Sequence, residues 1–110
     1  MSKEYKITLE ITHVAGICFG GCKVGQKYDL SITKTDNLCG TFYHSLFPML
    51  SIFEYDGDLW YLSDKNQMEV RCPDYINDVR GIMKREYVGE RKPPPPEVLE
   101  KMKELQKQKS

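Results

Sequence analysis

Residues 4–13 read EYKITLEITH, a stretch in which apolar and polar side chains alternate. The apolar positions are Tyr5, Ile7, Leu9 and Ile11. Because successive side chains of a strand point to opposite faces, this period of two predicts a β-strand with one buried face. Residues 27–33 alternate in the same way, so we expect the two segments to pair as a hairpin.

The segment between these two strands, AGICFGGCKVGQ at 15–26, contains four glycines. Glycine permits positive φ and close backbone approach, so we expect a tight, folded loop. The loop contains Cys18 and Cys22. Backbone N–H groups of such a loop can face sulfur atoms and stabilise negative charge on them.

In residues 38–53 the apolar positions recur about every 3.6 residues, which predicts a helix with one buried face. Asp36 or Asn37 is expected to serve as the N-cap. Pro48 has no amide hydrogen and interrupts the helical hydrogen bonds. We therefore expect a short helix to about Phe47, followed by a bend and another helical turn.

Three further segments are predicted strands. LWYL at 59–62 is a short apolar run between turns, and NQMEVRCPD at 66–74 alternates with Val70 and Cys72 in apolar positions. Residues 79–88 are expected to form the last strand. Together the elements predict an α+β fold, a small and mostly antiparallel sheet with one bent helix.

Four consecutive prolines in KPPPPE at 92–97 mark a boundary, because such a run forms a stiff, extended spacer. We therefore expect a single α+β domain at 1–90, and a proline-rich spacer with an amphipathic helix at 91–110. A helix this short is marginal alone, so we expect it to dock on its own domain, to join a homo-oligomer or protein partner, or to fray. Its narrow apolar stripe consists of Val98, Leu99, Met102 and Leu105.

The formal net charge is zero, so no global field attracts the chain to nucleic acid or to an anionic membrane. The first residues, MSKEYK, lack the apolar region of a signal peptide, and no apolar run reaches membrane-spanning length. We therefore expect a cytoplasmic protein that binds neither nucleic acid nor membrane. Thiols stay reduced in that compartment, which argues against structural disulfides.

The chain has four cysteines, two in the glycine-rich loop, one at the predicted helix start and one at the end of a late strand. Four thiolates from three separate elements can close a tetrahedral zinc site or hold a [4Fe–4S] cluster. The paired C-x-x-C motifs of zinc ribbons are absent, so zinc and iron–sulfur both stay open. The alternative is that some are buried core thiols. The candidate metal ligands are Cys18, Cys22, Cys39 and Cys72.

His44 follows Cys39 by five residues, an offset of about 140° on an ideal helix. We name His44 as the candidate catalytic residue, a general acid or base beside the centre. The alternatives are a metal ligand, an outer hydrogen-bond donor or a structural histidine. A metal-independent enzyme would instead use Cys39 as nucleophile and His44 as base. A third interpretation is a non-catalytic interaction module whose cysteines are structural.

Several short motifs occur in a defined order along the chain: Cys18 to Gly25, Leu38-Cys39, Phe42 to Pro48, and Cys72-Pro73-Asp74. This order, C-x3-[HC]-K-x-G, LC, F-x-H-x-L-x-P and CPD, resembles a family of small uncharacterised microbial proteins. Members of that family commonly have His where this chain has Cys22, an exchange that a metal-ligand position tolerates. The resemblance implies no activity, and the proline spacer and C-terminal helix fall outside it.

Overall fold

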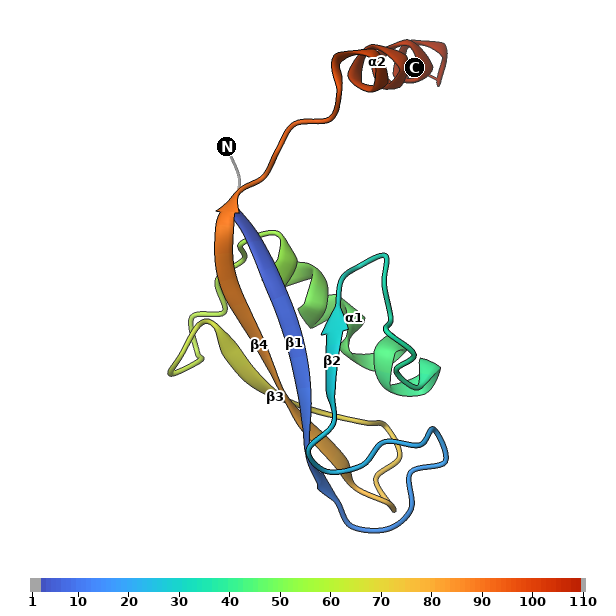
Figure 1. Ribbon diagram of the computed structural model, residues 1–110, viewed down its shortest axis with the longest axis vertical. Helices are drawn as coiled ribbons and strands as arrows, with labels where there is room; N and C mark the ends of the chain where they lie inside the picture. The colour runs from blue at the N-terminus through green and yellow to red at the C-terminus, as the bar shows by residue number, and fades with distance from the viewer. Residues whose placement is uncertain (1–2, 110) are drawn as a thin grey trace.

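The computed structural model describes residues 3–109 and contains a four-stranded antiparallel sheet in the order β2-β1-β4-β3, with two helices (Figure 1). The predicted α+β fold is therefore confirmed. Residues 1–2 and 110, at the ends of the two predicted segments, lie outside the described part of the chain. The elements are β1 (Lys3–Val14), β2 (Lys27–Leu30), α1 (Gly40–Glu54), β3 (Gln67–Arg71), β4 (Val79–Glu90) and α2 (Pro96–Lys109).

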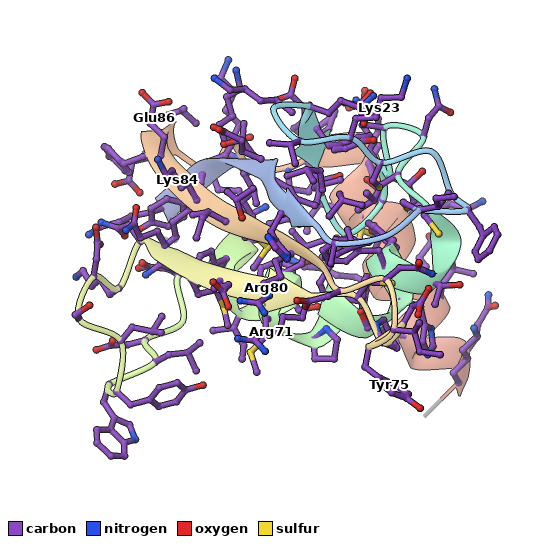
Figure 2. All side chains as sticks on the ribbon, turned by 90° about the horizontal axis from the view of Figure 1, so that it is seen from below. Lys23, Arg71, Tyr75, Arg80, Lys84 and Glu86 are labelled. Carbon is purple, nitrogen blue, oxygen red and sulfur yellow. The ribbon has the colours of Figure 1, made fainter. Side chains whose placement is uncertain are left out.

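The two long strands β1 and β4 form the centre of the sheet, and their register decides which side chains reach the core. Leu9 lies opposite Met83, and both are fully buried. On the other face of the sheet, Lys84 and Glu86 of β4 are exposed (Figure 2). Strand β2 pairs antiparallel with β1, which confirms the predicted hairpin. The buried face of the two central strands comprises Ile7, Leu9, Ile11, Val79 and Met83.

Helix α1 covers the buried face of the sheet (Figure 1). It is continuous from Gly40 to Glu54 with Pro48 inside, so the helix does not end near Phe47 as the sequence predicts. Pro48 is exposed, so the carbonyl group that it leaves without an amide partner can meet water. The side chains that α1 buries are Phe42, Leu46, Leu50 and Phe53.

The N-cap of α1 is Cys39, so the prediction of Asp36 or Asn37 at this position is wrong. Asp36 and Asn37 instead form a turn with left-handed φ values of 51° and 64°. The Asp36 carboxylate accepts the backbone amide of Asp29 at 2.9 Å. The predicted capping group is therefore used to close the connection from β2 rather than to begin the helix.

The segment LWYL is a turn within the loop from α1 to β3, so the predicted strand at 59–62 is wrong. The amide of Leu62 donates to the carbonyl of Leu59 at 3.0 Å, which closes the turn. Both leucines pack against the core, whereas Trp60 and Tyr61 between them are exposed. The apolar run therefore reflects two leucines that face inward from a turn, not a strand.

Helix α2 lies apart from the sheet at the end of an extended spacer (Figure 1). None of its described residues is buried. Within residues 3–109, neither helix has the length and hydropathy required to cross a membrane.

One charged side chain, Arg85, occupies the buried face of β4 with 6% exposure. Its Nε donates to Asn66 Oδ1 at 3.0 Å and its Nη1 donates to the carbonyl of Phe53 at 3.3 Å. The guanidinium also lies 4.7 Å from the ring centre of Tyr5 and 5.0 Å from that of Phe53. Arg85 therefore ties β4 to the C-terminal end of α1 and to the loop before β3.

We expect Arg85→Met to lower the free energy of unfolding by about 2 kcal/mol or more, because it removes the hydrogen bond to Asn66 and the buried hydrogen bond to the carbonyl of Phe53. Urea unfolding followed by circular dichroism measures this change. The matched control is Lys84→Met, on the exposed face of the same strand, which we expect to have little effect. Equal losses in the two variants would show that Arg85 does not have this role.

Candidate metal centre

Two loops at one end of the sheet, together with the start of α1, position the four cysteines. Cys18 and Cys22 lie in the glycine-rich loop after β1, and Cys72 follows β3 directly. Cys39 is the N-cap of α1 and therefore precedes the first helical turn. Figure 1 shows the loop after β1 and the loop before β4 side by side, at the end of the sheet far from α2.

The four side chains converge at this end. Cys18, Cys39 and Cys72 line one cavity of about 140 Å³. Cys22 is more deeply buried, at 4% exposure, and lines a second cavity together with Cys18. The charges of Cys18 and Cys39 act on both Cys22 and Cys72. Each of the four sulfur atoms is therefore within electrostatic range of at least two others, and all four thiols are free.

The surroundings favour protonated thiols at two of these positions. The pKa of Cys22 is raised to about 11, mainly by burial; the Tyr28 hydroxyl acts to lower this pKa, and the nearby Cys18 and Cys39 act to raise it. That hydroxyl lies 3.9 Å from Cys22 Sγ. Burial also raises the pKa of Cys72, although a hydrogen bond from the backbone amide of Asp74 favours its thiolate. The sequence predicts backbone amides facing the sulfur atoms of Cys18 and Cys22 in the glycine-rich loop. The structure gives such a contact to Cys72, in the other loop.

The glycine-rich loop passes very close to the start of α1. A Cβ atom added to Gly20 would lie 2.6 Å from Cys39 Sγ, so only glycine fits without movement of the cysteine. Gly21 has φ +86°, which a side chain would strain, and its amide donates to the carbonyl of Cys18 at 3.0 Å. Gln26 Oε1 accepts the amide of Lys23 at 2.9 Å and so closes the loop beyond Cys22.

A hydrogen-bonded bridge joins the two cysteine loops. Asn77 accepts the amides of Ala15 and Gly16 at its carbonyl, at 2.9 and 3.1 Å, and the amide of Ile17 at its side-chain oxygen, at 3.0 Å. Its Nδ2 in turn donates to the Asp74 carboxylate at 2.7 Å. The local sequence pattern does not reveal that Asn77 binds a loop some sixty positions away.

His44 lies on the exposed side of α1. It is not among the side chains that line the cavity of Cys39, although Thr41 one turn earlier is. Among the described residues, His44 therefore does not share this cavity with the cysteines, and its catalytic role stays a prediction. His13, at the end of β1, has Nε2 3.3 Å from an Asp78 carboxylate oxygen.

The side chains do not yet form a ready ligand set. Within the part of the chain that the structure describes, no group of three or more His, Cys, Asp or Glu side chains is arranged to hold a metal ion. Metal binding therefore requires the cysteines to turn toward a common point. The ligand roles of Cys18, Cys22, Cys39 and Cys72 stay predictions.

Comparison with known proteins finds no family model, no curated protein and no solved structure that matches this chain. The resemblance to a family of small microbial proteins therefore stays a prediction from the order of the motifs.

We expect Gly20→Ala to lower the free energy of unfolding by about 1–3 kcal/mol, because the added methyl group overlaps Cys39. The same variant should change the alkylation rate of the Cys39 thiol, which must move. The matched control is Gly40→Ala, where an added Cβ meets nothing within 4 Å. Chemical unfolding and peptide mass spectrometry measure the two effects, and identical behaviour of both variants would contradict the close contact.

In metal-free, reduced protein at pH 7, we expect iodoacetamide to modify Cys22 more slowly than Cys18 or Cys39. The thiolate is the reacting species, and a pKa of about 11 together with burial leaves very little of it available. Below that pKa, the Cys22 rate should rise roughly tenfold for each unit of pH. Peptide mass spectrometry gives the three rates, and equal rates at pH 7 would contradict the burial of Cys22.

Proposed function

We propose that this protein is a small metal-binding protein whose centre is ligated by the thiolates of Cys18, Cys22, Cys39 and Cys72. One observation carries the proposal: each of the four sulfur atoms lies within electrostatic range of at least two of the others. Four thiolates this close would repel one another, so a cation is needed to hold them together. A bound metal ion would attract all four thiolates and so offset their repulsion.

The proposed centre is either zinc or a [4Fe–4S] cluster, because both take four thiolate ligands. With zinc the four-thiolate site is closed, and its role is structural. With a cluster, the same residues support redox chemistry or substrate binding at an iron. In both cases the Asp74 amide, which already faces the sulfur of Cys72, would stabilise the bound thiolate.

Exposed apolar side chains surround the proposed centre. Ile17 and Phe19 in the first cysteine loop are 71% and 89% exposed, and Tyr75 and Ile76 in the second are 85% and 75% exposed. Figure 2 shows Tyr75 directed away from the loop into solvent. Exposed apolar groups gathered on two adjacent loops are typical of a contact surface, so this end of the molecule is where a substrate or partner of the centre would bind.

The second candidate is a thiol-dependent enzyme that uses Cys39 and His44. One observation favours it: Cys39 is partly exposed at the N-terminus of a helix and lines a cavity, where a nucleophile is accessible. The position of His44 outside the lining of that cavity makes it the weaker candidate. The metal proposal uses all four cysteines, whereas the enzyme proposal uses one.

We further propose that the protein works in the cytoplasm, where its thiols stay reduced, and without nucleic acid. The zero net charge supports the second statement. A protein partner or a second copy is proposed to bind through α2.

We expect protein purified without oxygen to contain metal in a fixed ratio to the chain. Elemental analysis distinguishes the two centres: zinc gives a colourless protein with one metal ion, and a cluster gives a brown protein with about four irons and broad absorption near about 400 nm. Cys18→Ser or Cys72→Ser should weaken zinc binding by more than the roughly 10–100-fold that loss of an outer-shell partner costs.

The matched control is His44→Ala, on the same molecule but outside the cysteine cluster, which should keep its full metal content. Protein that is folded, reduced and free of metal after anaerobic purification, and that binds neither zinc nor iron on addition, would refute the metal centre. Rapid and selective alkylation of Cys39 in that protein, lost in His44→Ala, would favour the thiol enzyme.

A further inference from the structure

A pocket of about 220 Å³ lies away from the cysteine loops, and in the described part of the chain no acidic side chain lines it. It is formed by the start of β1, the second half of β4 and the two residues before β3. In Figure 1 the start of β1 and the end of β4 lie together, at the end of the sheet opposite to the cysteine loops. The lining residues are Lys3, Tyr5, Lys65, Asn66 and Tyr87.

Asn66 is held in place by three hydrogen bonds, which leaves one of its polar groups for the pocket. Its backbone amide donates to Asp64 Oδ1 at 2.9 Å, and its backbone carbonyl accepts the amide of Arg85 at 2.8 Å. Its side-chain oxygen accepts Arg85 Nε at 3.0 Å. Within residues 3–109 the remaining group, Nδ2, forms no hydrogen bond, and an amide nitrogen can only donate. Asn66 therefore presents to the pocket a donor whose orientation the buried Arg85 fixes.

Positive charge exceeds negative charge around this pocket. The Asp56 carboxylate accepts the Tyr5 hydroxyl at 2.6 Å, and this hydrogen bond is the main cause that lowers the pKa of Asp56. The charges of Lys3, Arg85 and Lys65 lower the same pKa, so three cations lie within electrostatic range of this carboxylate. Among residues 3–109 neither lysine forms an ion pair. Three cations against one carboxylate leave an excess of two positive charges, which favours a dianionic ligand.

Tyr87 forms an open wall of the pocket. Its ring meets that of Tyr5 edge to face, with the ring centres 6.2 Å apart, and Lys3 Nζ lies 5.9 Å from the Tyr87 ring centre. Tyr87 is 53% exposed, so a large part of its ring is open to a ligand. An aromatic ring beside a cation suits a ligand that joins an apolar group to an anionic group.

We propose that this pocket binds a phosphate monoester. The phosphate oxygens accept hydrogen bonds from Lys3, Lys65 and Nδ2 of Asn66, all of which are donors. A phosphate monoester is mostly dianionic above about pH 6, so its charge matches the local excess of positive charge. The pocket has room for about seven groups of the size of water, more than an inorganic phosphate ion fills, so the organic part of the ester lies beside Tyr87.

The test titrates phenyl phosphate into the isotope-labelled, reduced full chain and follows the amide signals by NMR. At about pH 7.5 and low salt we expect a Kd of about 1 mM, with the side-chain amide of Asn66 among the signals that shift most. Inorganic phosphate should bind about threefold more weakly or less, because it lacks the ring. Phenol, which lacks the phosphate, should not bind in the same range.

Asn66→Asp is the sharpest variant. It keeps an oxygen that accepts Arg85 Nε, and it replaces only the donor Nδ2 by a negatively charged oxygen. We expect this variant to bind phenyl phosphate at least about tenfold more weakly, because the new charge repels the phosphate. Its unfolding midpoint should not fall, because the contact with Arg85 is retained, and this separates loss of the site from loss of the fold.

The two lysines provide a second test with a matched control. Lys3→Met and Lys65→Met should each weaken phenyl phosphate binding by about fivefold, because each removes a charged donor. Lys84→Met makes the same charge change on the exposed face of β4 and should leave the affinity within about twofold.

The same phosphate group is carried by free metabolites and by phosphorylated side chains of other proteins. A short peptide with phosphotyrosine between alanines distinguishes these sources. Tighter binding of the peptide than of phenyl phosphate would identify a protein segment as the ligand, whereas equal or weaker binding would identify a small free monoester.

Four results would overturn the proposal. The first is that phenyl phosphate does not bind up to about 10 mM. The second is that phenol or inorganic phosphate binds as tightly as phenyl phosphate. The third is that Lys84→Met loses as much affinity as Lys3→Met and Lys65→Met, which would indicate general attraction by surface charge. The fourth is that Asn66→Asp binds as tightly as the natural chain. None of these results depends on the metal centre, because the pocket shares no residue with the cysteine loops.

Discussion

The antiparallel pairing of β1 with β4 is the constraint on which the rest of the structure depends. Val14 at the end of β1 lies opposite Val79 at the start of β4. Because the two strands meet at these ends, the loop that follows β1 and the loop that precedes β4 must lie side by side. That juxtaposition brings Cys18 near Cys72, and the hydrogen bonds of Asn77 hold the two loops together.

A second constraint acts on the space around the sulfur atoms. The loop after β1 has to pass beside Cys39, and the lack of a side chain at Gly20 is what permits the approach. The result is a cluster of free thiols, one of them nearly inaccessible to water. Burial disfavours the charged forms of Cys22 and Cys72, and neighbouring thiolates disfavour them further. Thiolates at all four positions would therefore repel one another, and the proposed metal centre would offset that repulsion.

The molecule separates its two candidate functional regions by its full length. The cysteine loops lie at one end of the sheet, whereas α2 lies beyond the opposite end, on a spacer stiffened by proline (Figure 1). A partner or second copy bound at α2 would therefore leave the cysteine loops uncovered. The apolar side chains on those loops, such as Phe19 and Tyr75, would stay available for a substrate or another protein.

The local pattern of the sequence alone predicted the four strands of the sheet, because alternation such as that in EYKITLEITH depends only on neighbouring residues. It also located α1 and the proline boundary. The local pattern did not predict features that depend on contacts between residues far apart in the sequence. The cap of α1 differed because Asp36 is bound to β2, and LWYL formed a turn because its two leucines face the core together.

For the candidate site, residue types and spacing named the four cysteines, but their approach to one another, the burial of Cys22 and the bridge of Asn77 follow from the tertiary structure. The physical reason is that strand pairing brings together residues far apart in the chain, and a side chain's burial and hydrogen-bond partners are properties of that assembled surface.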